Sequence, residues 1–162
     1  MHVVAPSVAD VVEHAGGWLF DRSMAGWEVT VLLARMGDPR PLHILGARAG
    51  EFAPFLDPVD RGRLPHSLAV AVEMCHTEPR AHAGLAQALA ATALEVRTWG
   101  DPGRELPDIR LAPAPVVHRL SLAARTFKSH ALIAAGRPDD DAPIETFHSP
   151  AAATPPSCTS PS

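Results

Sequence analysis

Basic side chains gather in residues 116–135, where hydrophobic periodicity predicts a helix. His118, Arg125 and Lys128 fall within one narrow arc of that helix, and the segment contains no acidic residue. Imidazole, guanidinium and ammonium groups arranged in this way can contact phosphate, nucleic acid or acidic peptides. The competing interpretation is an ordinary solvated face whose charges dock locally, for instance against the acidic residues that follow.

A second group of candidates follows from the loops after predicted strands. Open α/β sheets bind ligands beyond the carboxyl ends of their strands. That rule points to Arg48, which follows a predicted strand over 42–46, and to Trp99 and Asp101, at the end of another over 94–99. A cleft near these residues would suit a nucleotide or a phosphorylated metabolite. The alternative for Trp99 is simple packing.

Nine histidines and two cysteines raise the question of a metal site. The densest local group is Cys75-His76 with His82, but its spacing matches no standard pair of zinc ligands, and Pro79 intervenes. The two cysteines, Cys75 and Cys158, lie far apart and suit a reducing cytoplasm. We therefore expect neither a metal nor a cofactor.

The sequence contains none of the common catalytic signatures. There is no GxxxxGK phosphate loop, no GxGxxG after a strand, no HExxH and no GxSxG. Isolated carboxylates occur, but the sequence alone places none of them opposite another. They are Asp21, Glu28, Asp38 and Asp101. These observations lead us to lean against an enzyme.

The best-defined structural pattern runs from Ser7 to Leu33. Apolar residues recur at helical spacing after Ser7, a natural N-cap with Asp10 three residues later. The pair Gly16-Gly17 indicates either a break in this helix or very close packing. Residues 27–33 then alternate as a strand. No strand is predicted before the helix, which argues against a dinucleotide-binding unit.

The remaining elements are less sharply marked. The linker between the strands at 27–33 and 42–46 is too short for a parallel crossover, so these strands should pair antiparallel or lie apart. The other predicted elements are a helix over 64–75, with a strand over 68–72 as the alternative, a helix from 77 to about 91, the strand over 94–99 and the helix over 116–135, ended by Gly136.

Together these elements indicate one α/β domain, or a mixed α+β domain, over residues 1–137. We expect a mixed sheet of three or four strands packed by about four helices. Residues 138–162 contain six prolines and three consecutive aspartates, which predict a disordered tail. Ending the chain after Gly136 should then leave the melting temperature nearly unchanged.

The net charge of −4 offers no overall electrostatic footprint for nucleic acid or an anionic membrane, and no apolar run is long enough to span a membrane. We favour a small cytoplasmic accessory or regulatory protein that binds a protein partner through its last helix. Two alternatives stay open: a binding protein or enzyme for a small-molecule anion, with a cleft near Trp99 and Asp101, and a nucleic-acid-binding protein. The sequence also leaves open whether the protein forms a homodimer.

Overall fold

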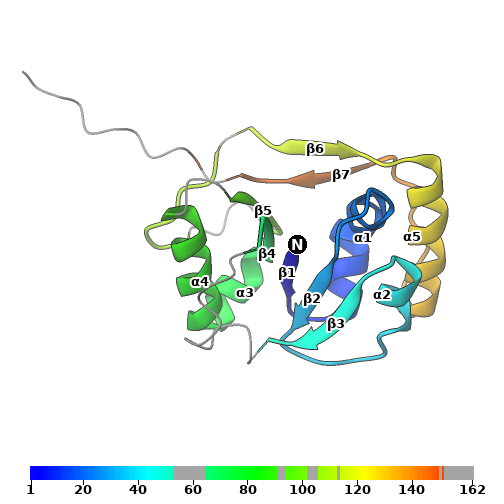
Figure 1. Cartoon of the computed structure of the whole chain (residues 1–162), viewed down its shortest axis with the longest axis horizontal. Helices are drawn as coiled ribbons and strands as arrows, with labels where there is room; N and C mark the ends of the chain where they lie inside the picture. Colours follow the sequence, from blue (N-terminus) through cyan, green and yellow to red (C-terminus); the bar gives the residue numbers. More distant parts are fainter. Residues whose placement is uncertain (53–64, 91–93, 102–105, 113, 150, 152–162) are drawn as a thin grey trace, which may run out of the picture.

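Five parallel strands form the central sheet of the protein (Figure 1). The computed structural model describes residues 1–52, 65–90, 94–101, 106–112, 114–149 and 151. The strands are β1 (His2–Ala5), β2 (Thr30–Leu33), β3 (Arg48–Glu51), β4 (Ser67–Ala71) and β5 (Glu95–Trp99). Their order across the sheet is β3-β2-β1-β4-β5, so the chain winds outward from β1 in both directions.

Helices lie on both sides of this sheet. On one side α1 (Val8–Met24), α2 (Arg40–Ile44) and α5 (Leu122–Ala134) contact one another. On the other side α3 (Val72–Thr77) packs against α4 (Pro79–Ala90). The result is a three-layer arrangement with the core between the sheet and its two helical layers.

The predicted α/β class is confirmed, but the sheet differs in strand number and direction. It has five strands, all parallel among the described residues, where we expected three or four strands with an antiparallel pair. The missed strand is β1, which lies between β2 and β4. A short strand buried on both faces carries no alternation to mark it. From sequence we predicted no strand before the first helix, and the structure shows that β1 lies there.

The helix-to-strand unit that follows Ser7 is confirmed. The Ser7 hydroxyl accepts a hydrogen bond from the Asp10 backbone N–H at 3.3 Å, as expected of an N-cap. The helix runs unbroken through Gly16 and Gly17, so close packing rather than a break explains that pair. The strand is shorter than predicted and begins at Thr30.

Three other predicted elements were wrong in type. The expected strand over 42–46 lies mostly in α2, which has a proline in its first turn, and β3 follows it. The expected helix over 64–75 is β4 followed by α3, so the strand alternative was right; all five β4 residues are buried. The expected helix over 116–135 is divided by Ser121, the N-cap of α5. The helix α4 and the strand β5 were predicted correctly.

An antiparallel ribbon lies outside the main sheet. It pairs β6 (Val116–Arg119) with β7 (Ile144–Phe147). After β7, the backbones of His148 and Thr98 exchange two hydrogen bonds of 2.7 Å, which join the ribbon to β5. Figure 1 shows β6 and β7 spanning the molecule from α5 toward β5.

The ribbon corrects our prediction of a disordered tail over 138–162, because β7 lies inside that segment. Phe147 is fully buried, with its ring centroid 5.0 Å from that of Trp18. Buried and exposed residues alternate along β7, but Glu145 is buried and Ile144 is exposed, so the sequence itself shows no apolar alternation that would mark this strand. Residues 152–162 lie outside the described part of the chain. Within the described ranges, no helix is long and apolar enough to cross a membrane.

Candidate functional site

A cleft of about 210 Å³ lies at the carboxyl ends of β4 and β5. This is the edge at which open α/β sheets bind ligands. The first half of α1 contributes two residues to it, and the start of α3 contributes two more. The described residues that line the cleft are Asp10, His14, Ala71, Val72, Glu73, Trp99, Gly100 and Asp101.

Asp10 is fixed in this cleft from two sides. Its backbone N–H donates to the capping hydroxyl of Ser7, and its Oδ2 accepts the indole N–H of Trp99 at 3.0 Å. Burial raises the pKa of the Asp10 carboxyl above its usual range, and the charge of Glu73 adds to this effect. The Trp99 hydrogen bond and His14 act in the opposite direction without cancelling the rise. A carboxyl group perturbed in this way inside a cleft is a candidate for proton transfer.

His14 follows Asp10 by one helical turn. Its Nδ1 lies 2.9 Å from the backbone oxygen of Asp10 and 3.4 Å from Oδ1 of the same residue. A carbonyl oxygen only accepts, so this hydrogen bond assigns the proton of the neutral imidazole to Nδ1. The lone pair is then on Nε2. A ring held in this way is arranged as a base, with an acidic residue at its back.

The cleft is acidic. Its described lining includes three carboxyl groups, those of Asp10, Glu73 and Asp101, and neither arginine nor lysine. The carboxyl groups of Asp10 and Glu73 would repel a phosphate group at these short distances. The electrostatics favour a neutral or cationic ligand over the nucleotide or phosphorylated metabolite that the sequence suggested.

The same residues do not make a metal site. Over the described ranges, no group of three or more His, Cys, Asp and Glu side chains is placed to hold a metal ion. One oxygen of Asp10 already accepts an indole hydrogen bond, and Nδ1 of His14 faces the backbone. A zinc site needs at least three converging protein ligands, which this arrangement does not supply.

Of the residues that sequence reasoning assigned to a cleft, the structure brings two together. Trp99 and Asp101 both line it. Arg48 does not: it pairs with Thr30 at the amino end of β3, an edge strand. The amino ends of parallel strands lie at the opposite edge of the sheet from the cleft.

The basic residues assigned to the last helix are separated from one another. His118 lies in β6, with Nε2 2.8 Å from Oδ2 of Asp21. Arg125 donates to the backbone oxygen of Asp141 at 3.0 Å. Lys128 is only 2% exposed and forms an ion pair of 2.8 Å with Glu145. The continuous basic face that would have contacted nucleic acid is therefore not formed by these three residues.

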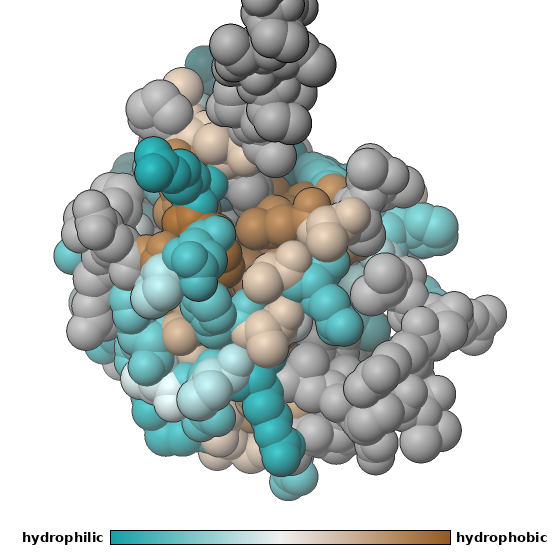
Figure 2. All heavy atoms as spheres, turned by 90° about the vertical axis from the view of Figure 1, so that its left-hand side faces the viewer, coloured by the Kyte–Doolittle hydropathy of each residue, from teal (hydrophilic) through white to brown (hydrophobic). Residues whose placement is uncertain are grey.

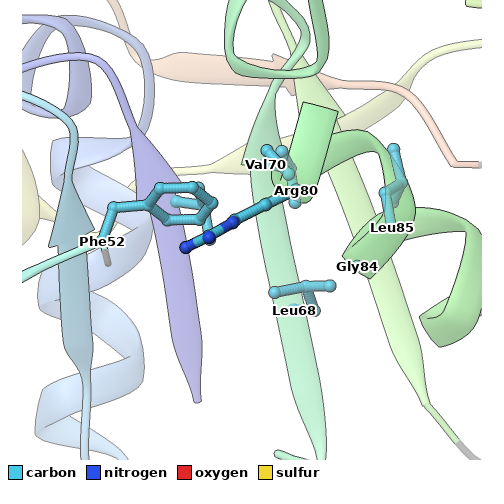
Figure 3. Close-up of a pocket in the computed structure, with 8 residues that line it drawn as sticks. Phe52, Leu68, Val70, Arg80, Gly84 and Leu85 are labelled. Atoms are coloured by element: carbon cyan, nitrogen blue, oxygen red, sulfur yellow. The ribbon is translucent and has the colours of Figure 1, made fainter. Parts of the chain in front are cut away.

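A second, smaller pocket lies between the sheet and α4 (Figure 3). Its volume is about 10 Å³, which is roughly the space of a single water molecule. Figure 3 shows the Arg80 side chain extending toward the ring of Phe52, with Leu68, Val70 and Leu85 nearby. Figure 2 shows apolar side chains gathered toward the middle of the face that carries α4. This pocket is a packing gap and not a second ligand site.

Sequence reasoning missed Asp10, His14 and Glu73. A signal existed for the first two, because residues four apart on a helix share a face and here both are titratable. We interpreted Asp10 only as part of the helix cap. Glu73 was hidden because the predicted helix over 64–75 placed no strand end before it.

Comparisons with known proteins support the fold. No family model and no curated protein matches the chain. Among solved structures, the deacetylase of the A40926 pseudoaglycone superposes with a TM-score of 0.65 at 17% identity, over 93% of this chain and 96% of that one. A deacetylase–teicoplanin complex gives a TM-score of 0.63 at 14% identity, over 93% and 97%. A zinc-inhibited form of teicoplanin deacetylase gives 0.51 at 18% identity, over 82% and 83%. At these identities the chain is similar to them in fold.

These comparisons overturn two of our predictions. The chain shares its fold with solved deacetylases, one of them from the biosynthesis pathway of teicoplanin, so the prediction of a regulatory protein that binds a protein partner was wrong. Our leaning against an enzyme was wrong for the same reason. The structural neighbours favour the alternative, a small-molecule enzyme or binding protein with a cleft near Trp99 and Asp101.

Proposed function

We propose that the protein is an enzyme that removes an acyl group from a small molecule by hydrolysis in the cleft at the ends of β4 and β5. One observation carries the proposal: Asp10 and His14 both line that cleft, with Nδ1 of His14 3.4 Å from Oδ1 of Asp10. The fold adds support, because the similar solved structures include deacetylases along nearly their whole length.

The chemistry follows from the tautomer of His14. Its Nε2 takes a proton from a bound water as the water oxygen adds to the acyl carbon. The bond from that carbon to the leaving nitrogen or oxygen then breaks, and the same proton passes to the leaving group. The products are a carboxylic acid and an amine or alcohol. The Asp10 carboxylate stabilises the positive imidazolium that forms between the two steps.

The dimensions and charge of the cleft limit the substrate. Its volume of about 210 Å³ is smaller than the roughly 300–1,000 Å³ typical of pockets for drug-sized ligands. The carboxyl groups of Asp10 and Glu73 favour a substrate that is neutral or that carries an amino group. We therefore propose a compact, uncharged or cationic acyl compound as the substrate.

The experiment is a release assay on a panel of small N-acyl and O-acyl compounds, with the freed acid detected by proton NMR. His14→Gln should abolish release. His43→Gln, which changes an exposed histidine on α2, is the matched control and should retain it. A panel compound that binds in the cleft without release would contradict hydrolysis. Release that persists in His14→Gln would contradict the assigned base.

We also propose the cytoplasm as the compartment. Cys75 is a free, buried thiol, and burial raises its pKa to about 11. A reducing compartment would keep such a thiol unmodified.

A further inference from the structure

We infer that Trp99 is a positioning residue that orients Asp10 toward His14. This inference rests on the proposed function, because it gives Asp10 a role in the reaction. Trp99 would act through Asp10 and would not contact the substrate itself.

The two oxygens of Asp10 serve different partners. Oδ2 accepts the Trp99 indole N–H at 3.0 Å, and Oδ1 lies 3.4 Å from Nδ1 of His14. The hydrogen bond to Oδ2 restricts rotation of the carboxyl group and so keeps Oδ1 directed at the imidazole. A base works best when its orienting carboxylate is itself held in place.

Trp99 is well suited to this task because it cannot move easily. It is 1% exposed and is the last residue of β5, paired in register with Ala71 of β4. Its only polar side-chain atom is Nε1, which points at Asp10. The indole, held by the sheet, therefore restricts the movement of the Asp10 side chain on α1.

A second tryptophan shows that burial alone does not explain this hydrogen bond. Trp18 is fully buried, yet its indole nitrogen finds no hydrogen-bond partner among the described residues. Within the described part of the chain, a buried indole N–H thus does not require a hydrogen-bond partner. The Trp99 contact to a titratable side chain in the cleft is a distinct arrangement.

The first test uses the indole signals in a ¹⁵N–¹H NMR spectrum of the full-length protein. The chain has three tryptophans, so Trp99→Phe should remove one of three side-chain signals and thereby assign it. In the native protein that signal should shift with pH as Asp10 ionises. In Asp10→Asn, which keeps an acceptor oxygen but cannot ionise, the titration should disappear. A Trp99 signal that ignores pH, or that titrates equally in Asp10→Asn, would overturn the inference.

The same signal tests whether Asp10 acts as a metal ligand instead. Zinc bound through Asp10 would compete with the indole for the carboxylate and would move the Trp99 signal at stoichiometric concentrations. We expect no such movement when zinc chloride is added. A stoichiometric shift that is absent in Asp10→Asn would show that a metal, and not Trp99, orients this carboxylate.

A kinetic test separates positioning from mere folding. Trp99→Phe removes one hydrogen bond to a carboxylate, so kcat/KM should fall about tenfold or more. The pH dependence of kcat/KM should also change, because the lost hydrogen bond had favoured the ionised form of Asp10 and its loss raises the pKa of that carboxyl further. Trp27→Phe, at a partly buried tryptophan outside the cleft, is the control and should leave the profile unchanged.

The outcomes distinguish the inference from the proposed function. If no acyl compound is hydrolysed, the proposed function fails while the NMR titration still reports on the Trp99–Asp10 contact. If hydrolysis occurs but Trp99→Phe lowers only the melting temperature and leaves the pH profile in place, the positioning role is refuted. Should Trp99→Phe fail to fold, the Asp10→Asn titration still decides the matter.

Discussion

Adjacent glycines in the middle of α1 should respond oppositely to the same substitution. A Cβ added at Gly17 would overlap Cγ and Cδ2 of Leu120 and would lie 3.3 Å from Oε1 of Glu145. A Cβ added at Gly16 would meet nothing closer than 3.4 Å, the distance to Leu45 Cδ1. Gly17 therefore permits a close approach that Gly16 does not need.

The magnitude follows from comparing Gly17→Ala with Gly16→Ala. Each substitution gains about 1 kcal/mol of helix propensity, and that gain cancels in the difference between the variants. Overpacking a rigid core costs about 1–3 kcal/mol. Leu120 is 6% exposed and has little room to move. We expect Gly17→Ala to be less stable than Gly16→Ala by about 1–3 kcal/mol.

Chemical denaturation followed by circular dichroism measures this difference directly. In thermal melts the gap should be about 2–12 °C, using roughly 2–4 °C per kcal/mol for a chain of this size. Gly16→Ala should be as stable as the native protein or slightly more stable. Equal stability of the two variants would show that Leu120 yields freely, and the argument for close packing at Gly17 would be wrong.

Three further predictions follow from the buried charges. Lys128→Met should lower the free energy of unfolding by about 3–5 kcal/mol, because it leaves Glu145 buried without its cation. The double variant with Glu145→Gln should lose less free energy of unfolding than the two single variants lose in sum. A double-mutant cycle by urea denaturation checks this; strict additivity would argue against the pair. Ending the chain after Gly136 should lower the melting temperature by about 10 °C or more, since β7 carries Glu145 and Phe147, and an unchanged melting temperature would contradict this. The pKa of Asp10 is raised in the folded protein, so its contribution to stability is present at low pH and is lost as the pH rises through the folded-state pKa. Asp10→Asn cannot ionise at this position, so its stability relative to the native protein should increase between about pH 3 and pH 7. Urea melts at several pH values test it, and a flat difference would refute the shift.

Elements that carry their own periodicity could be predicted from sequence. The helix after Ser7 and the strand before Gly100 are examples, because each has an alternation or a cap that is local in the chain. β1 and β4 could not be assigned in this way. Both are short, central and buried on both faces, so they appear as plain apolar runs.

The ribbon of β6 and β7 was not predicted for a different reason. β6 is a strand because it pairs with β7, which lies more than twenty residues downstream across α5. Local sequence carries no record of such a partner. Lys128 shows the same limit. From sequence we treated it as a surface charge, whereas the structure buries it beside Glu145 of β7, whose carboxylate forms its ion pair.

Only part of the candidate site could be predicted, because some of its residues lie at the end of a strand that the sequence marks and others lie on a helix placed by a strand that it does not mark. Trp99 and Asp101 follow a recognisable strand, and the rule about carboxyl ends found them. Asp10 and His14 reach the same cleft only because β1, which we missed, directs α1 across the ends of its neighbours. An unrecognised central strand thus hid the residues with the clearest chemistry.

The position of α1 links the cleft to the far end of the chain. Its first half carries Asp10 and His14, while the backbone N–H groups of Gly17 and Trp18 each donate to the Glu145 carboxylate at 2.8 Å. Hydrogen bonds to a charged acceptor are among the stronger ones, and here they are buried. β7 therefore helps to hold the helix that presents the proposed catalytic pair. Every described residue that lines the cleft precedes position 102, yet a chain that ended before β7 would lose contacts on which their placement depends.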